Sequence, residues 1–362
     1  MQASLPGIRY APSGLQFFWH IGKIMNRHKT ILALALALSA MTTPTCHAQS
    51  TSTEPGLSLS KGPGQAYPAK TVRVVVPFAP GGSNDIVGRY LTAHLSERLG
   101  RQFVIDNRGG AGGIVGTEMV AKSAPDGYTL VVVSVAFPMS AAIYKLPYDP
   151  VKAFTPIALL ATGANGLAVH PALPVKTVRE LITLAKARPG QLQYSSAGVG
   201  TFQHLSSEMF KSLAGVDILH VPYKGGGPAT IDLIAGQVQL SIASLVVILP
   251  HARTGKIRIL ATGGATRAAT LPNVPTIAEA GVPGYEAANW WGLLAPTGTP
   301  DAVIKKLNAE ANTVMSLAES KKRLGAEGVE TIAATPEQFA KHITSEMAKW
   351  GKVTRDANIK AE

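Results

Sequence analysis

The chain is poor in the residues that build covalent or metal-centred chemistry. Its 362 residues include one cysteine, Cys46, in a segment with the composition of a secretory signal. Cleavage after Ala48 would leave no cysteine, so no disulfide, thiol nucleophile or cysteine-based metal site is predicted. The nine histidines are dispersed, without an H-E-x-x-H motif or a nearby pair of carboxylates at metal-binding spacing. We therefore expect neither a metal nor another cofactor.

Nucleotide-binding and hydrolase motifs are missing as well. The G-x-G-x-x-G fingerprint fails at Val115 in "GAGGIV" and at Gln203 in "GVGTFQ", and the sequence contains neither G-x-x-x-x-G-K-[ST] nor G-x-S-x-G. The Ser and His of "SSAGVGTFQH" could serve as nucleophile and base, but this loop carries no acid. Binding without catalysis is predicted, and a hydrolase acting on an acid stays open as an alternative.

The charge of the chain is positive but spread out. The formal net charge is +12, and the first 48 residues contribute four basic residues and no acid, which leaves +8 for the rest. No cluster of Lys and Arg is interleaved with aromatic residues, so nucleic-acid binding is not predicted. A mild positive field is compatible with anionic solutes or an acidic partner surface.

The N-terminal region divides into three segments. Residues 25–48 begin with basic residues, continue with a short apolar run and end in small residues, which is typical of a cleavable signal peptide for export to the periplasm. Residues 1–24 precede this complete signal and are interpreted as an upstream extension, with Met25 as the true start. Residues 49–66 are polar and rich in Ser, Thr, Gly and Pro, so we expect a disordered linker.

Beyond the linker, short apolar runs alternate with helix-length segments. "VRVVV", "FVIDN" and "YTLVVVS" read as strands, with helices expected at residues 85–100 and 113–124 between them. The same alternation recurs from residue 178, and includes a turn of helix at "TIAEAG"; the tail from residue 301 is mostly helical. Strands alternating with helices predict an α/β fold with a parallel, doubly wound sheet in each of two halves. The loop "SVAFPMSA" (residues 134–141) is a candidate for the remainder of a ligand pocket.

Three glycine-containing loops join a strand to a helix: "FAPGGSND", "SSAGVGTFQH" and "YKGGGPAT". In an open α/β sheet, ligands lie beyond the carboxyl ends of the strands. The helix that follows offers unpaired N–H groups and partial positive charge, and glycine lets the backbone approach closely. Such loops hold a carboxylate, phosphate or sulfate without a charged side chain. The glycines of the third loop also fit a flexible turn.

Individual residues in these loops have competing explanations. His204 lies one turn into a helix, where it could face the ligand or be a histidine of the helix surface or core. Asp85 favours its helix N-terminus electrostatically, with ligand contact as the alternative. Lys224 is either a solvated lysine at a turn or a ligand contact.

Longer motifs extend from Tyr67 to the C-terminus. They include "VRVVVPFAPGGSNDIVGRYL", "IDNRGGAGGIVGTEMVAKSAPDGYTL", "QYSSAGVGTFQHLSSEMF", "HVPYKGGGPATIDLIAGQV", "LPNVPTIAEAGVPGYE" and "WWGLLAPTGTP". In this order they closely resemble the Bug (TctC-like) receptors, the periplasmic solute-binding proteins of tripartite tricarboxylate transporters.

The resemblance implies a two-lobed, flytrap-like periplasmic binding protein of type II, without catalytic activity and expected as a monomer. Lobe 1 would join residues 69–165 to residues 289–362, and lobe 2 would comprise residues 166–288. A small carboxylate (a di- or tricarboxylate, an acidic amino acid or an aromatic acid) would bind between the lobes and a membrane permease would receive it. A module that senses the same ligand for a signalling system is the alternative. The implied ligand contacts are Phe78, Ala79, Gly81, Gly82, Ser134, Ser196, Ala197, Gly200, Thr201 and His204, whereas Asn107 and Arg108 would be structural.

Overall fold

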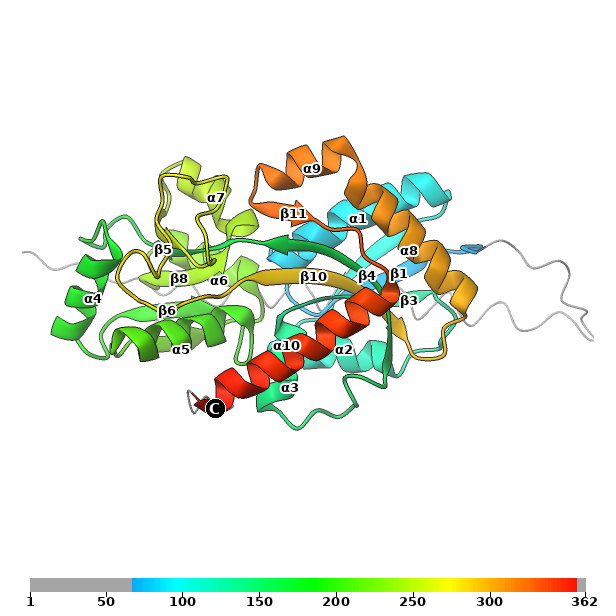
Figure 1. Ribbon diagram of the computed structural model, residues 1–362, viewed down its shortest axis with the longest axis horizontal. Coiled ribbons are helices and arrows are strands. Elements are labelled where there is room, and N and C mark those ends of the chain that lie inside the picture. Colours follow the sequence, from blue (N-terminus) through cyan, green and yellow to red (C-terminus); the bar gives the residue numbers. More distant parts are fainter. Residues whose placement is uncertain (1–66, 357–362) are drawn as a thin grey trace, which may run out of the picture. The chain divides into compact units, whose positions relative to one another are not determined.

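The computed structural model describes residues 67–356, which belong to one compact unit, Gly62–Glu362. The predicted upstream extension, signal peptide and linker lie outside the described residues. Two β-sheets with helices around them make up the described part of the chain (Figure 1). None of its helices combines the length and apolar character needed to cross a membrane.

The first sheet has six strands in the order β11-β4-β10-β3-β1-β2. Its strands are β1 (Val72–Val76), β2 (Phe103–Asn107), β3 (Thr129–Ser134), β4 (Phe154–Gly163), β10 (Asn289–Pro296) and β11 (Val329–Thr331). Strand β1 is parallel to β2 and β3, whereas β10 runs antiparallel to both β3 and β4. The expectation of a purely parallel sheet is therefore wrong here, because a strand from a distant segment inserts in the opposite direction.

The second sheet has five strands in the order β7-β6-β8-β5-β9. Its strands are β5 (Asn165–Val169), β6 (Gln193–Ser196), β7 (Leu219–Pro222), β8 (Leu240–Ser244) and β9 (Arg258–Thr262). Strand β6 is parallel to β7 and β8, but β5 is antiparallel to β8 and β9. This sheet is mixed as well, which confirms the α/β class and corrects the strand directions.

Helices surround both sheets. Around the first lie α1 (Ser83–Leu99), the 3₁₀ turn η1 (Ala111–Gly113), α2 (Ile114–Ala121), α3 (Ala136–Ile143), α8 (Asp301–Ser316), α9 (Ala318–Gly325) and α10 (Pro336–Asp356). Around the second lie α4 (Val178–Ala187), α5 (Phe202–Ala214), α6 (Gly226–Ile234) and α7 (Leu245–Arg253). We call the first sheet with its helices lobe 1 and the second sheet with its helices lobe 2.

Local chemistry explains where several elements begin and end. Helix α1 ends where Gly100 takes the left-handed conformation, at φ 62°, which glycine adopts without steric cost. Helix α4 begins at Thr177, whose hydroxyl accepts a hydrogen bond from the Glu180 N–H. The segment "TIAEAG" forms the predicted single turn of helix, since Ala280 N–H donates to the Thr276 carbonyl at 2.9 Å, four residues back. The assignment of "SVAFPMSA" as a loop is wrong, since this segment contains the end of β3 and most of α3.

The chain passes between the two sheets twice. Strands β4 and β5 are separated only by Ala164, and the segment after β9 returns to the first sheet at Asn289. The two passages are tied together by Asn165, whose side-chain Nδ2 donates to the Ala287 carbonyl at 2.5 Å. The two connecting segments therefore lie next to each other, and their position determines which strand ends of the two sheets face each other.

Candidate functional site

A cavity lies where the carboxyl ends of strands from both sheets face each other. Its lining comes from the junctions β1–α1, β3–α3, β6–α5 and β8–α7, the start of α6, and Asn289 at the start of β10. The empty space within it measures about 450 Å³, including the part open to solvent. None of the side chains that line it is charged. An anion bound here would be held by backbone N–H groups and neutral side chains.

The residues expected as ligand contacts divide into two groups. Phe78, Gly82, Ser134, Ala197 and Thr201 line this cavity. The remaining five expected contacts lie beside it without forming its wall: Ala79, Gly81, Ser196, Gly200 and His204.

Helix α1 presents its N-terminus to the cavity. Gly82 precedes the helix, and the first helical hydrogen bond runs from Ile86 N–H to the Gly82 carbonyl at 3.0 Å. The N–H groups of Ser83 and Asn84 therefore have no partner within the helix, and both residues line the cavity. Because this end of a helix carries partial positive charge, it favours an anion.

Asp85 holds the first loop in place. Its carboxylate accepts hydrogen bonds from the Gly81 N–H at 3.0 Å, from Asn107 Nδ2 at 2.9 Å and from Arg89 Nε at 2.9 Å. Burial alone would raise the pKa of the Asp85 carboxyl, but these hydrogen bonds and the Arg89 charge outweigh it and leave the pKa lowered. Asp85 therefore acts on loop geometry, and it does not line the cavity.

Helix α5 presents a second N-terminus. Its first helical hydrogen bond runs from Leu205 N–H to the Thr201 carbonyl at 3.0 Å, so the N–H groups of Phe202 and Gln203 are open toward the cavity that these residues line. The Gln203 side chain is only 7% exposed, and it makes no hydrogen bond within the described part of the chain. Its amide group is therefore available to a polar partner inside the cavity.

The second loop is held by its own side chains. The Thr201 hydroxyl donates to the Gly198 carbonyl at 2.6 Å, and Gly198 N–H donates to Ser196 Oγ at 3.1 Å. Gly200 N–H donates to His204 Nδ1 at 3.2 Å. These bonds explain why Ser196 and His204 lie behind the loop rather than in the cavity wall.

His220 of β7 supports this loop and was missed in the sequence. Its ring lies between Tyr194 and His204, with ring centroids 4.8 Å and 4.3 Å away, and its Nε2 is 2.6 Å from Ser196 Oγ. Burial lowers the pKa of His220 to about 4, so the ring is neutral near pH 7. Ser196 thus pairs with His220 instead of His204, and it is fully buried. The only signal for His220 was a polar residue within a short apolar strand.

The third glycine loop contacts the first one across the lobes. Ala79 N–H donates to the Lys224 carbonyl at 3.0 Å. A Cβ on Gly225 would stand 2.8 Å from the Ala79 nitrogen, and a Cβ on Gly227 would overlap the Pro80 carbonyl oxygen. We call residues 79–82 and 224–227 the glycine seam. These glycines chiefly allow two backbones to touch, and Gly226 is the member of the third loop that lines the cavity.

Further polar residues of the cavity were not expected from the sequence. They are Ser83, Asn84, Gln203, Ser244 and Asn289. Ser83 and Asn84 lay inside the quoted first loop and Gln203 inside the second, so the strand-to-helix pattern could have found them. Ser244 and Asn289 gave no such signal, because neither lies in a glycine-rich loop.

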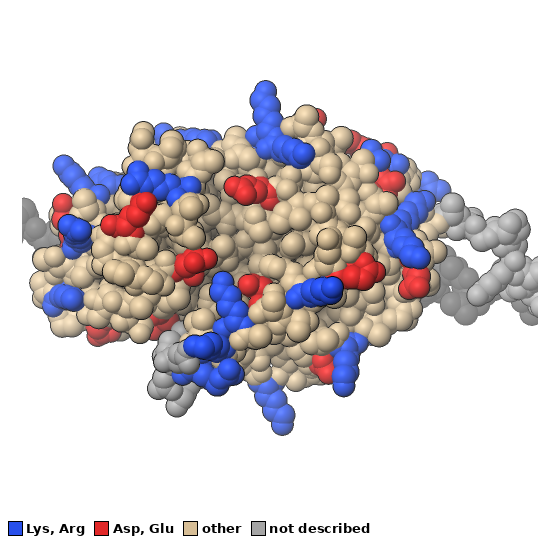
Figure 2. Space-filling view, viewed as in Figure 1, with Lys and Arg blue, Asp and Glu red and all other residues tan. Residues whose placement is uncertain are grey.

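Charged side chains of both signs occur on the face of the molecule shown in Figure 2. On the face shown in Figure 2, Lys and Arg side chains are spread over several elements, with Asp and Glu among them. Within the described residues, no group of three or more His, Cys, Asp or Glu is placed to hold a metal ion.

Residues 87–359 match the model of the tripartite tricarboxylate transporter family receptor. The chain belongs to this receptor family. It is 36% identical to the protein BugT of Bordetella pertussis over 297 residues, which covers 81% of this chain and 91% of BugT. Rpa4515 of R. palustris, solved with adipate, has 40% identity and a TM-score of 0.79, with 81% of this chain and 99% of that chain covered.

MatC of Rhodopseudomonas palustris, solved with bound malate, is also similar. It has 35% identity and a TM-score of 0.76, and the match covers 79% of this chain and 99% of MatC. Two sheets flanked by helices, with paired crossings between them, are consistent with the two-lobed fold of periplasmic binding proteins.

Proposed function

We propose that this chain is a periplasmic receptor that captures a small carboxylate between its lobes and delivers it to a membrane permease of the tripartite tricarboxylate type. The observation that carries the proposal is the cavity itself, which joins two open helix N-termini and contains no charged side chain. Family membership and the adipate and malate found in two relatives support the same ligand class.

The ligand carboxylate accepts hydrogen bonds from the first turns of α1 and α5, which belong to different lobes. Ligand binding therefore favours the arrangement in which the lobes touch, by the difference in its affinity for the two states. Of the ten expected contacts, the five in the cavity wall are proposed as ligand contacts, and the other five as support for the loops. Ser196, which is fully buried and pairs with His220, does not line the cavity, and this favours binding over hydrolysis.

A thermal-shift screen of the mature chain tests this function. A ligand present at 100 times its Kd stabilises the folded state by about 2.7 kcal/mol. For a chain of this size, this corresponds to a rise in melting temperature of roughly 4 °C. Succinate, malate, adipate and citrate are the probes, and the corresponding fully amidated, uncharged compounds are the control. If none of the acids shifts the melting temperature more than its amide, the carboxylate function is wrong.

Transport and sensing are separated by a second measurement. Pull-down of the ligand-loaded receptor with membrane fractions should recover an integral membrane permease, and deletion of the receptor should abolish uptake of the acid. Altered gene induction with unchanged uptake would instead support the sensing function.

A further inference from the structure

Ser244 lies at the N-terminus of α7, on the wall of the cavity and 5% exposed. Its Oγ accepts a hydrogen bond from Asn289 Nδ2 at 3.0 Å. The orientation of the Asn289 amide is fixed, because its Oδ1 accepts the Trp290 N–H at 2.9 Å. The amide nitrogen must therefore be the group that faces Ser244.

This contact determines what the Ser244 hydroxyl can do. An amide NH₂ group only donates, so the Ser244 oxygen acts as acceptor toward Asn289 and its own proton needs another acceptor. Within the described residues, no acceptor for this proton is found. A buried hydroxyl proton without an acceptor costs free energy unless a ligand or water supplies one. Asn289 thus holds Ser244 as a donor toward the cavity.

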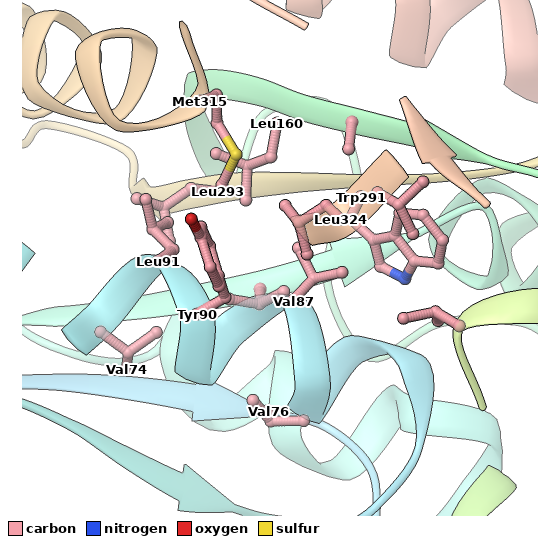
Figure 3. Close-up of a cluster of buried hydrophobic side chains, with 14 of the residues drawn as sticks. Val74, Val76, Val87, Tyr90, Leu91, Leu160, Trp291, Leu293, Met315 and Leu324 are labelled. Carbon is pink, nitrogen blue, oxygen red and sulfur yellow. The ribbon is translucent and has the colours of Figure 1, made fainter. Parts of the chain in front are cut away.

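Strand β10 also orients a hydroxyl of lobe 1. Trp291 Nε1 donates to Ser83 Oγ at 3.4 Å, and an indole nitrogen can only donate. Trp291 is fully buried at the edge of the hydrophobic cluster shown in Figure 3, which fixes its ring. Asn289 and Trp291 are two residues apart on one strand, so their side chains project to the same face. Through them, β10 aligns one serine in each lobe as a donor.

The two serines differ in their surroundings. Ser83 stands at the start of α1 and adds a hydroxyl to the backbone N–H groups that hold the ligand carboxylate. Ser244 ends β8, directly before a different helix, α7, and lines the same cavity. Of the neighbouring side chains in the wall, Gln203 and Ser134 are at least nine-tenths buried and make no side-chain hydrogen bond within the described residues. The cavity therefore has more polar side chains open to a ligand than a single carboxylate can use.

We propose that Ser244, held as a donor by Asn289, recognises a second carboxylate and makes this receptor selective for dicarboxylates over monocarboxylates of equal chain length. The inference rests on the proposed function, and it names Ser244 as the residue that determines the preference for dicarboxylates. The first carboxylate binds at α1 and α5, and the second binds at the start of α7.

Isothermal titration calorimetry with matched acids tests the inference. The probes are succinate against butyrate and adipate against hexanoate. The wild-type receptor is expected to bind at least one diacid more tightly than its monoacid. Because a hydrogen bond to a charged group contributes about 1.5–3 kcal/mol, Ser244→Ala should weaken diacid binding roughly 10- to 100-fold and leave monoacid binding unchanged.

Two variants control for a merely structural effect. Ser241→Ala removes a buried hydroxyl from the same strand, β8, whose proton is already donated to the Ser195 carbonyl at 3.0 Å, so it should not change the ratio of diacid to monoacid affinity. Ser244→Thr keeps the hydroxyl and should retain most of the preference. An equal loss for diacid and monoacid in Ser244→Ala would overturn the inference, as would a wild-type receptor without diacid preference.

A double-mutant cycle tests the role of Asn289. If Asn289 acts by orienting Ser244, then Asn289→Ala should weaken diacid binding less than Ser244→Ala, and the double variant should bind no worse than Ser244→Ala alone. Additive losses would contradict the orienting role. If no acid binds the wild-type receptor, the proposed function itself is refuted. If acids bind but diacids are not preferred, only the inference about Ser244 is refuted.

Discussion

The first two glycine loops face the same cavity but are stabilised in different ways. The second loop, residues 196–201, is closed by hydrogen bonds within lobe 2, from the Thr201 hydroxyl to Gly198 and from Gly198 to Ser196. The first loop, residues 78–82, receives support from Asp85 and Asn107, and in addition its Ala79 N–H bonds to the Lys224 carbonyl of lobe 2. The hydrogen bonds that support the second loop all come from its own lobe, whereas the first loop receives one of its hydrogen bonds from lobe 2.

This difference indicates how ligand binding and lobe contact are coupled. The hydrogen bonds that close the loop before α5 all lie within lobe 2, so we expect the α5 N-terminus to be the preformed half of the proposed site. The α1 N-terminus gains its last backbone bond only at the glycine seam. A change at the seam should therefore alter affinity without touching the ligand, and a change behind the second loop should alter the stability of lobe 2 instead.

The largest effect is expected for Gly227→Ala. The added methyl group would overlap the Pro80 carbonyl oxygen when the lobes touch. Overpacking of this kind costs about 1–3 kcal/mol, so we expect roughly 5- to 150-fold weaker dicarboxylate binding in calorimetry. Stability of the unliganded protein should be unchanged or slightly higher, because alanine is favoured over glycine in a helix.

Gly325→Ala is the matched control for this change. Gly325 ends α9, and a Cβ there would meet no atom within 4 Å. Its affinity should equal that of the wild type. If Gly227→Ala binds as tightly as this control, the glycine seam has no part in binding and the distinction between the two loops is lost.

A smaller effect is expected from the pH dependence of the second loop. The pKa of His220 in the folded protein is lowered to about 4 by burial, against about 6.5 in an unfolded chain. Below pH 6.5 the unfolded chain binds the proton and the folded protein does not, so the free energy of unfolding falls as the pH decreases from about 6.5 to 4. Above pH 6.5 this contribution is constant.

His220→Phe should remove this part of the pH dependence while keeping a ring in the stack. Melting temperatures measured from pH 4.5 to 8 should fall less steeply toward acid in the variant. Burial also lowers the pKa values of His251 and His342, so some slope remains in both proteins and only the difference reports on His220. If the melting temperatures of wild type and variant fall in parallel toward acid pH, His220 does not cause this part of the pH dependence.

Much of this arrangement follows from local sequence patterns. Gly100 predicted the end of α1, and the breaks after "VRVVV" and "QYSS" predicted two loops that open onto one cavity. These features depend on neighbours in the sequence, such as the left-handed backbone of Gly100 and the unpaired N–H groups of a helix start. They need no contact with a segment that is distant in the sequence.

Other features depend on segments that meet only in the folded chain. The glycines of the third loop contact the backbone around Pro80, Ser244 is oriented by Asn289 of β10, and His220 stacks between two rings. No local pattern distinguishes a glycine that approaches a ligand from one that approaches another lobe. The antiparallel insertion of β10 was missed for the same reason, and it is this strand that aligns both serines.

The smallest effect is expected for Lys224→Ala. The Lys224 carbonyl oxygen accepts the bond from Ala79, but its exposed side chain makes no hydrogen bond or ion pair within the described residues. Alanine preserves the carbonyl, so affinity should change by less than about 0.5 kcal/mol, as for most surface substitutions. Calorimetry at low and high salt checks this result, since a charge that contacts the ligand would be screened. A salt-sensitive loss of more than about tenfold would mean that the ammonium group reaches the ligand, and lobe 2 would then contribute a charge as well as a backbone contact.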